Sequence, residues 1–291
     1  MFFKNKSSNQ SKDKFNDAPK GKVIAFLNQK GGVGKTTMCF NSAHALREKG
    51  HRVLCIDMDP QANLSLLFDV DLSETEGASI HHLMVNSVRE LKSLHTPNLL
   101  SDVLVKGDVD LIPACQDLSG FELTMAPING PRQLILRRFL EKNDLLSKYD
   151  YILLDCPPTL GLLVINSVCA VDGVIVPFRP DDFSKKGLLH FYEMLEDVED
   201  MGIVNSPKIL AHIPNLVDNR RKQEELDLEE IRSVIIDKLG EDRLLEPFYN
   251  RAQLVKSQAS KKSVYDYGSK EFKPLHQQFS KIADVIETLN H

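Results

Sequence analysis

The residues best suited to chemistry form one short run, Asn28-Gln-Lys-Gly-Gly-Val-Gly-Lys-Thr-Thr37, which follows an apolar segment and precedes a helical pattern. Its glycines, Gly31, Gly32 and Gly34, allow a tight turn in which successive backbone N–H groups point at phosphate oxygens. A helix that begins near Lys35 would add the positive end of its dipole at the same place. The run therefore predicts a nucleotide site.

Two side chains after the glycines have separate tasks in such a site. The Lys35 ammonium reaches the β- and γ-phosphates, and the Thr36 hydroxyl binds Mg²⁺. The surrounding backbone completes the phosphate cradle. The predicted nucleotide contacts are Lys30, Gly31, Gly32, Val33, Gly34, Lys35, Thr36 and Thr37.

The loop departs from the common G-x-x-x-x-G-K-[ST] pattern in one respect. Gln29 stands at the place of the first glycine, and an additional lysine, Lys30, directly precedes Gly31. This arrangement resembles the deviant P-loop of the ParA/MinD group of ATPases. In that group the extra lysine reaches across a dimer interface to the phosphates of the other subunit, much as an arginine finger does. The resemblance implies that Lys30 is catalytic and that ATP drives formation of a homodimer.

Two further segments share this resemblance and contain acidic residues. Residues 56–63 resemble the family's switch I, which implies that Asp57 supports the Mg²⁺ shell and that Asp59 positions or activates the attacking water. Residues 149–158 form an apolar strand pattern ending in Asp155, which by resemblance holds Mg²⁺ through water. The catalytic residues expected from the resemblance are Lys30, Lys35 and Asp59, and the expected metal ligands are Thr36, Asp57 and Asp155.

Alternating strand and helix patterns must position these motifs. Short runs rich in β-branched residues predict strands at 23–27, 53–56, 109–112, 151–154, 174–176 and 209–213. Apolar residues spaced by three and four predict helices, including one through Leu188 and Leu195 and one after Pro131, whereas 64–108 is expected to mix helix and loop. The alternation predicts an α/β fold, a predominantly parallel twisted sheet with helices on both faces.

Composition limits the classes of protein that fit. The chain has 291 residues, of which 42% are hydrophobic and 26% charged, which suits one large domain. We expect a flexible basic tail at 1–21 and a single ATPase domain at 22–291. Six lysines up to Lys22 stand against Asp13 and Asp17, so the tail is either solvated or a basic arm for an anionic surface.

The sequence argues against a membrane-spanning protein and against one built around cysteine disulfides or cysteine-bound metals. No apolar run approaches the ~18 residues of a membrane-spanning helix, so we expect no membrane partner. The five cysteines are scattered without a C-x-x-C pair, which argues against a disulfide framework, a zinc site or a cysteine-ligated cluster. A reducing cytoplasm is the expected compartment.

The C-terminal third bears on which branch of the family fits. Residues 217–222 and 247–251 resemble segments of the Soj branch that point to Arg220 and Arg251 as DNA contacts, and Lys261 and Lys262 follow. Such cations neutralise phosphates of double-stranded DNA without sequence preference. Between 219 and 262, however, ten basic residues face nine acidic ones, so a mixed solvated surface stays open. From resemblance alone, the expected adenine contacts are Pro247 and Phe248.

The resemblance implies a ParA/Soj-type DNA-segregation ATPase. Mg-ATP would drive dimerisation and non-specific DNA binding, and hydrolysis stimulated by a ParB-like partner would release a nucleoid-associated, cytoplasmic protein. A ParA-like ATPase that positions another cargo is the main alternative. A cofactor-insertion ATPase and a MinD-like membrane ATPase are less expected, the latter because residues 279–291 carry one lysine and two acids and form no basic amphipathic helix.

Overall fold

The computed structural model of the chain describes residues 20–71, 73, 78–88, 100–218, 220–240 and 243–290. The expected basic tail therefore lies, except for its last two residues, outside the described residues and stays a prediction. The same holds for part of the segment 64–108, for which we expect mixed helix and loop.

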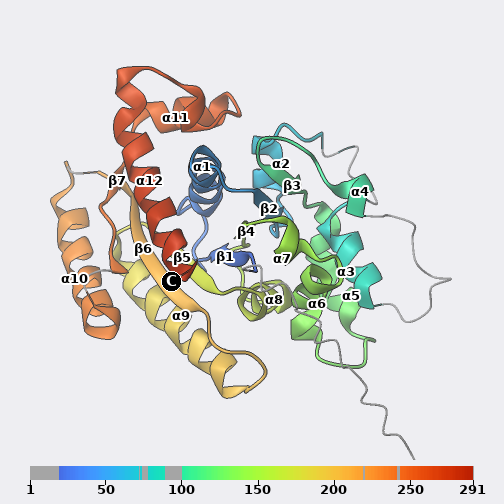
Figure 1. Ribbon diagram of the computed structural model, residues 1–291. Helices are drawn as coiled ribbons and strands as arrows, with labels where there is room; N and C mark the ends of the chain where they lie inside the picture. The colour runs from blue at the N-terminus through green and yellow to red at the C-terminus, as the bar shows by residue number, and fades with distance from the viewer. Residues whose placement is uncertain are drawn as a thin grey trace, which may run out of the picture.

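One parallel sheet forms the centre of the described chain (Figure 1). Its strand order is β3-β2-β4-β1-β5-β6-β7, and every neighbouring pair runs parallel. The strands are β1 (Lys22–Phe26), β2 (Val53–Asp57), β3 (Asp110–Ile112), β4 (Tyr151–Asp155), β5 (Gly173–Phe178), β6 (Lys208–Val217) and β7 (Phe248–Tyr249). All six expected strands are present, and the α/β prediction is confirmed, whereas the two-residue β7 was not expected from the sequence.

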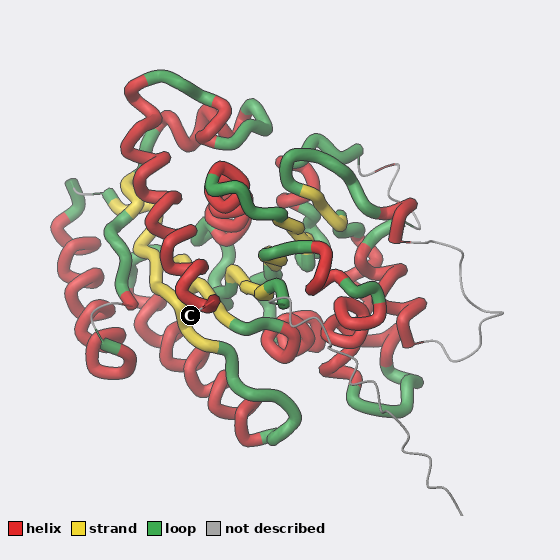
Figure 2. The backbone as a smooth tube through the Cα atoms, viewed as in Figure 1, coloured by secondary structure: helices red, strands yellow, loops and turns green. Residues whose placement is uncertain are grey.

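Helices cover both faces of this sheet, as the tube in Figure 2 shows. In chain order they are α1 (Lys35–Glu48), α2 (Asn63–Leu67), α3 (Ile80–Val88), α4 (Leu100–Val103), α5 (Phe121–Met125), α6 (Ile135–Lys142), α7 (Leu145–Lys148), α8 (Leu162–Ala170), α9 (Asp182–Asp200), α10 (Lys222–Leu239), α11 (Ala252–Ala259) and α12 (Lys273–Glu287). Short 3-10 turns include η3 (Gln116–Gly120) and η4 (Arg132–Leu134). The expected helix after Pro131 is η4 continued by α6.

Alternation along the strands divides the apolar residues between two cores. In β1 and directly after it, Val23, Ala25 and Leu27 join one cluster, while Ile24 and Phe26 join the other. Successive side chains of a strand point to opposite faces, so both faces of a buried parallel strand must be apolar. This explains why the strand runs of the sequence are continuously apolar.

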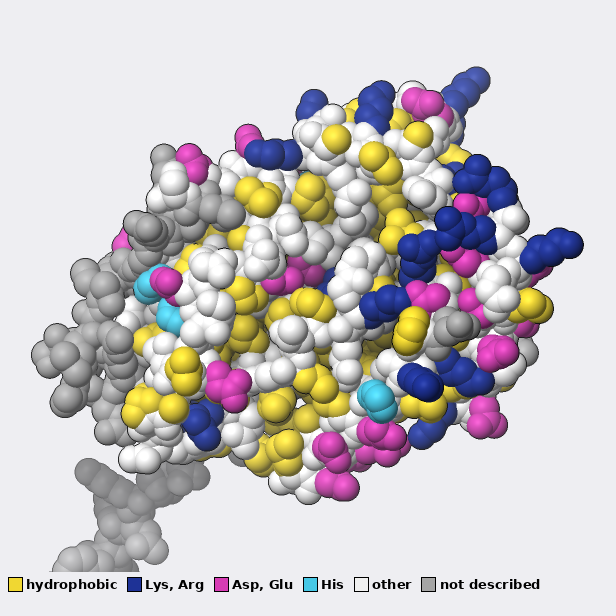
Figure 3. All heavy atoms as spheres, turned by 180° about the vertical axis from the view of Figure 1, so that it is seen from behind, with side chains coloured by type: hydrophobic (Ala, Val, Ile, Leu, Met, Phe, Trp, Pro, Cys, Tyr) yellow, Lys and Arg dark blue, Asp and Glu magenta, His cyan; other side chains and the backbone are white. Residues whose placement is uncertain are grey.

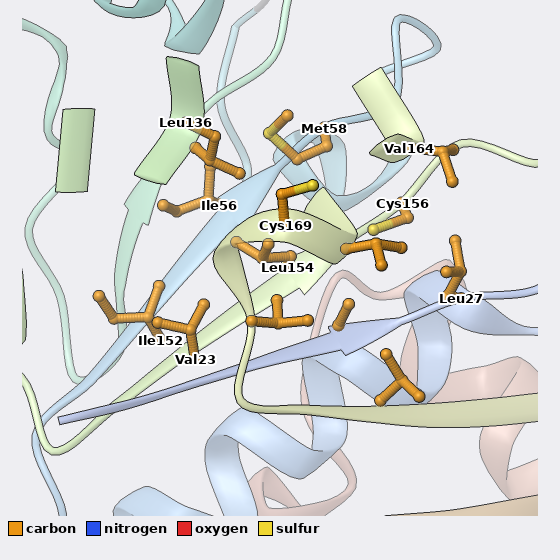
Figure 4. Close-up of a cluster of buried hydrophobic side chains, with 14 of the residues drawn as sticks. Val23, Leu27, Ile56, Met58, Leu136, Ile152, Leu154, Cys156, Val164 and Cys169 are labelled. Atoms are coloured by element: carbon orange, nitrogen blue, oxygen red, sulfur yellow. The ribbon is translucent and has the colours of Figure 1, made fainter. Parts of the chain in front are cut away.

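The first core lies between the sheet and the helices α6, α8 and α9. Figure 4 shows part of it, with Ile56 and Leu154 from neighbouring strands directed toward Leu136 and Cys169. Cys156 belongs to the same cluster and is fully buried, and burial raises the pKa of its thiol to about 12. Cys156 therefore acts as a small buried hydrophobic residue.

The second core lies beneath α1 and α12, which pack against each other. Met38 of α1 and Phe279 and Ile282 of α12 are fully buried there. At the ends of the two helices, the Lys49 ammonium lies 2.5 Å from the Glu287 carboxylate. The helix that begins in the glycine-rich loop is thus covered by the last helix of the chain.

Candidate nucleotide site

Hydrogen bonds to a neighbouring strand fix the entry of the glycine-rich loop. Asn28 follows β1, and its side-chain amide donates to the Pro177 carbonyl of β5 at 2.8 Å. Its side-chain oxygen accepts from the backbone N–H of Lys30 at 2.9 Å. Asn28 is buried, so these two bonds satisfy polar atoms that would otherwise be costly to desolvate.

The exit of the loop depends on two glycines and one distant asparagine. Gly32 and Gly34 have φ angles of 71° and 93°, in the left-handed region that favours glycine. A Cβ at Gly34 would lie 2.2 Å from Nδ2 of Asn215 in β6, and this amide donates to the Val33 carbonyl at 2.8 Å. The tight turn at Gly34 therefore packs directly against Asn215 of strand β6.

Lys35 is held in the loop as a buried cation. It opens α1, is 7% exposed, and its Nζ donates to the Lys30 carbonyl at 3.1 Å. Burial lowers the pKa of Lys35, whereas the neighbouring carboxylates of Asp155 and Asp59 raise it. A buried ammonium next to a glycine-rich loop is suited to bind phosphate oxygens.

The two strand-end carboxylates expected at the metal lie on paired residues. Parallel register places Asp57 of β2 opposite Asp155 of β4. Asp57 accepts hydrogen bonds from the Ser65 backbone N–H at 2.8 Å and the Ser65 hydroxyl at 2.7 Å, yet full burial raises its pKa to about 6. Asp57 is thus a fixed carboxylate whose oxygens already have partners.

Asp155 differs from Asp57, because no hydrogen bond of good geometry from the described residues reaches its oxygens, although the Thr36 hydroxyl lies close enough to act on its pKa. Both of its carboxylate oxygens are buried and lack a hydrogen-bond partner within the part of the chain that the structure describes. Burial, and then the Asp57 charge, raise the pKa of Asp155 well above its ordinary value, while the Thr36 hydroxyl and Lys35 lower it. A buried carboxylate beside a hydroxyl and a second carboxylate is the donor set that Mg²⁺ prefers, so these residues fit the ion.

Asp59 lies in the loop after β2, next to a hollow in the surface. It is 9% exposed, and its Oδ1 accepts from the backbone N–H of Gln61 at 2.9 Å. A cavity of about 450 Å³ lies between Asp59, the proline pair Pro157-Pro158 and the η3–α5 segment. Its position at the carboxyl ends of β2 and β4 is compatible with the predicted contact to a water.

Lys30 forms an ion pair that the sequence did not indicate. Its Nζ contacts the carboxylate of Asp181, which caps α9 by accepting from the backbone N–H groups of Phe183 and Ser184. The Lys30 and Asp181 side chains are 35% and 31% exposed. Asp181 follows β5, far from the loop in sequence, and no spacing rule connects the two residues.

Thr36 and Thr37 face different surroundings. Thr36 is half-buried and close to Asp155, as expected of a metal ligand. The Thr37 hydroxyl instead accepts from the side-chain amide of Gln258 in α11. Gln258 thus joins Asn215 and Asp181 among the residues that support the loop and that sequence reasoning missed.

The expected adenine contacts lie at the edge of the sheet. Pro247 is half-buried, and Phe248 of β7 is buried with its ring centroid 5.0 Å from that of Phe279. β7 pairs with β6 at Asn215, so both residues lie near the loop. The Phe248 ring belongs to the core, so adenine contact by this segment stays a prediction.

The expected DNA contacts lie beyond the ends of β6 and β7 and around α11. Arg220 is 86% exposed and forms two hydrogen bonds of 2.8 Å to Asp218, and Lys261 lies 2.5 Å from Asp69. Arg251 is half-buried before α11, and Lys262 is exposed after it. Seen from behind, Lys and Arg side chains gather along the upper edge and the right-hand side of the molecule (Figure 3). The described surface there is mixed in charge, so DNA contact by these cations stays a prediction.

Comparison with known proteins agrees with this geometry. The family described as "AAA domain" matches residues 21–208. The chromosome partitioning protein ParA of Caulobacter vibrioides is 33% identical over 222 residues, which are 75% of this chain and 78% of the relative. The chain belongs to the ParA-type family of P-loop ATPases.

Other relatives of this ParA-type chain differ in length or in name. An uncharacterized protein of Mycobacterium tuberculosis is 35% identical over 224 residues, which are 76% of this chain but only 64% of the relative's length. The crystal structure of cobyrinic acid a,c-diamide synthase from Mycobacterium smegmatis, with an ATP analog and magnesium, has a TM-score of 0.71 and 29% identity, covering 91% of this chain and 93% of that one. Within the described residues of this ParA-type chain, no helix has the length and apolar character needed to cross a bilayer.

Proposed function

We propose that this ParA-type chain binds Mg-ATP at the loop 28–37 and hydrolyses it to ADP and phosphate. The observation that carries the proposal is the buried Asp155 carboxylate, whose oxygens have no partner among the described residues although Lys35 and Thr36 lie close by. Such a carboxylate is costly unless a cation compensates it. Mg²⁺, when bound, bridges phosphate oxygens and neutralises their charge.

The residues of the chain divide the work in this proposal. Lys35 and the N–H groups of residues 31–37 hold the phosphates, while Thr36, Asp57 and Asp155 hold the metal directly or through water. Asp59 orients the attacking water. Pro247 and Phe248 lie in the segment that we propose contacts the adenine.

We further propose that ATP joins two copies of the chain, with Lys30 of each copy reaching the phosphates bound by the other. In the single chain Lys30 is paired with Asp181, and both side chains are about one-third exposed, so the pair can separate without leaving a deeply buried charge unpaired. Phe183, at the start of α9 beside Asp181, is 77% exposed and Leu160 is 55% exposed. Exposed large apolar residues around the loop support burial of this face by a second copy.

The dimer would then bind double-stranded DNA non-specifically and associate with the nucleoid in the cytoplasm. The cations that we assign to DNA are Arg220, Arg251, Lys261 and Lys262. Dimerisation presents this set twice, so ATP raises affinity by avidity with no new type of contact. A ParB-like partner would stimulate hydrolysis and release the dimer, as in a partition ATPase.

Salt-dependent DNA binding with and without ATP tests this function. We expect affinity for two unrelated duplexes to be similar and to fall with salt at a slope near −0.9 per neutralised phosphate. Arg220→Glu and Arg251→Glu should weaken DNA binding and reduce the slope by about one per cation, while ATP affinity is kept. Arg137→Glu is the matched control, because Arg137 is also an exposed arginine paired with an acid, Glu141, on another part of the surface.

Two experiments distinguish this proposal from its alternatives. If the ATP-bound dimer forms but shows no salt-sensitive DNA binding, positioning of another cargo by the same ATP switch becomes the better function. The neighbour named cobyrinic acid a,c-diamide synthase favours a second candidate, ATP-dependent amide formation. Release of ADP and phosphate in the presence of DNA alone, with no amine donor, would argue against that candidate.

A further inference from the structure

Three potential metal ligands meet on the side of the molecule that carries α3. They are His82 of α3, Cys115 in the loop after β3, and Asp117 at the start of η3. One ligand atom from each lies within 4.8 Å of the other two. The His82 Nε2 atom lies 3.5 Å from Oδ2 of Asp117. The sequence argued against a zinc site because the chain has no C-x-x-C pair, and it did not indicate this group because His82 lies far from the other two residues along the chain.

Hydrogen bonds hold the two segments of this His82–Cys115–Asp117 cluster together. The backbone N–H of Ile80, the first residue of α3, donates to the Pro113 carbonyl at 2.9 Å. The Ser79 hydroxyl lies 3.1 Å from Nδ1 of His82 and 3.0 Å from Sγ of Cys115. One backbone hydrogen bond and the Ser79 side chain therefore hold His82 and Cys115 close together.

The donor types select the class of metal. An imidazole nitrogen, a thiolate sulfur and a carboxylate oxygen together suit Zn²⁺ and its neighbours Co²⁺ and Ni²⁺, whereas Mg²⁺ and Ca²⁺ prefer oxygen alone. Three protein ligands leave a fourth tetrahedral position for water. The cluster is thus chemically distinct from the all-oxygen set of Thr36, Asp57 and Asp155.

The cluster is also accessible to an ion. The Asp117 side chain is 61% exposed and that of His82 is 19% exposed. Cys115 is 9% exposed, whereas the other four cysteines are between 0% and 3% exposed. Cys115 is therefore the thiol best placed to bind a metal from solution.

We propose that His82, Cys115 and Asp117 bind a divalent transition metal of the Zn²⁺ class. The ion would join α3 to the loop 113–117. This loop also contacts the nucleotide site, because the Ala114 N–H donates to the Ser65 hydroxyl at 3.0 Å and that hydroxyl donates to Asp57. The site is separate from the proposed ATPase function and does not require it.

Cobalt titration of the untagged, metal-free full chain tests the site. Mg²⁺ in excess is present to occupy oxygen-only sites, and no nucleotide is added. We expect one equivalent of Co²⁺ to give the absorption band of cobalt–thiolate charge transfer, and Zn²⁺ to displace it. Cys115→Ser should abolish the band, and His82→Gln should weaken Zn²⁺ binding in calorimetry by about tenfold or more.

Cys169→Ser is the matched control, since Cys169 lies outside the cluster and is 3% exposed. This variant should keep both the band and the affinity. A band that survives in Cys115→Ser, or Zn²⁺ binding that is equal in the wild type and His82→Gln, would overturn the proposal. Circular dichroism verifies folding, and Asp117→Asn replaces Cys115→Ser in calorimetry if the latter does not fold.

Discussion

Replacing Gly34 with alanine tests the support that β6 gives to the glycine-rich loop. The φ angle of 93° at Gly34 is unfavourable for an L-residue by about 1–2 kcal/mol. The added Cβ would also lie 2.2 Å from Nδ2 of Asn215, so the asparagine must move and its 2.8 Å bond to the Val33 carbonyl is lost. Loss of that bond costs about 0.5–1.5 kcal/mol. We expect Gly34→Ala to lower the free energy of unfolding by about 2–3 kcal/mol.

Urea unfolding of the nucleotide-free protein measures this difference. The midpoint should fall while the m-value is unchanged, because the change affects stability and not the area exposed on unfolding. Gly31→Ala is the matched control in the same loop. A Cβ there would have no neighbour within 4 Å among the described residues, and Gly31 is not in the left-handed region. Gly31→Ala should therefore cost no stability.

A double-mutant cycle separates the steric part from the backbone part. Asn215→Ala removes both the hydrogen bond and the atom that the new Cβ would meet. Gly34→Ala combined with Asn215→Ala should therefore be less destabilised than the sum of the single variants, by about 1 kcal/mol. Strict additivity, or equal stability of Gly34→Ala and Gly31→Ala, would refute the close approach of β6 to the loop.

Five further outcomes follow from the site and the cores. Lys35→Ala should abolish ATP binding in calorimetry. Lys30→Ala should still bind ATP, but it should lose ATP-dependent dimerisation in light scattering, and its turnover rate should fall by about 10³-fold. A Lys30→Ala variant that dimerises normally contradicts the proposed role of Lys30. Asp59→Ala should bind ATP and dimerise yet hydrolyse slowly, so failure to bind Mg-ATP would mean that the roles of Asp57 and Asp59 are exchanged. Asp155→Asn removes a buried carboxylate that lacks partners. In the absence of Mg²⁺ and ATP it should therefore raise the free energy of unfolding, measured with urea, by about 1–3 kcal/mol, and an unchanged free energy contradicts this. The same variant should weaken Mg-dependent ATP binding. Burial lowers the pKa of His212 to about 4, so the unfolded chain binds a proton on this side chain more readily than the folded chain does. The free energy of unfolding should therefore fall by up to about 3 kcal/mol as the pH drops from 6.5 to 4. His212→Gln should make the free energy of unfolding depend less on pH, and an unchanged dependence would show that His212 does not contribute.

The central fold and its phosphate loop could be predicted because they depend on local patterns. Each of the first six strands contains a short run rich in apolar residues, and the run 28–37 combines glycines with lysine and threonine in a fixed order. β7 could not be found in this way, since two residues carry no periodicity. Its position depends on pairing with β6 and on the buried ring of Phe248, which are properties of the tertiary structure.

The support of the candidate site was beyond prediction for the same reason. Asp57 and Asp155 each end a strand run and could be foreseen, because carboxyl ends of parallel strands meet at one edge. Asn215, Asp181 and Gln258 contact the loop from strands and helices far along the chain. Ordinary polar residues at unremarkable positions give no signal until the topology brings them together.

The packing of α12 on α1 has a consequence for folding during synthesis of the chain. α1 is synthesised early, whereas α12 and the segment before it, which pack on α1, are synthesised late. In that segment the Val264 N–H donates to the Asn41 side chain of α1 at 2.9 Å. Lys49 and Glu287, which pair at the ends of the two helices, are 238 positions apart. At 5–20 residues per second the ribosome needs on the order of 10–50 s to span that distance.

During that interval the side of α1 that α12 covers has no partner from the same chain, although Phe40 can already pack on Phe68. The nascent protein therefore depends on chaperones or on slow collapse at this stage. A copy that ends before α12 would expose this face permanently and is expected to aggregate or be degraded. Such fragments would not persist as folded, nucleotide-binding subunits that could poison the assembly of complete ones.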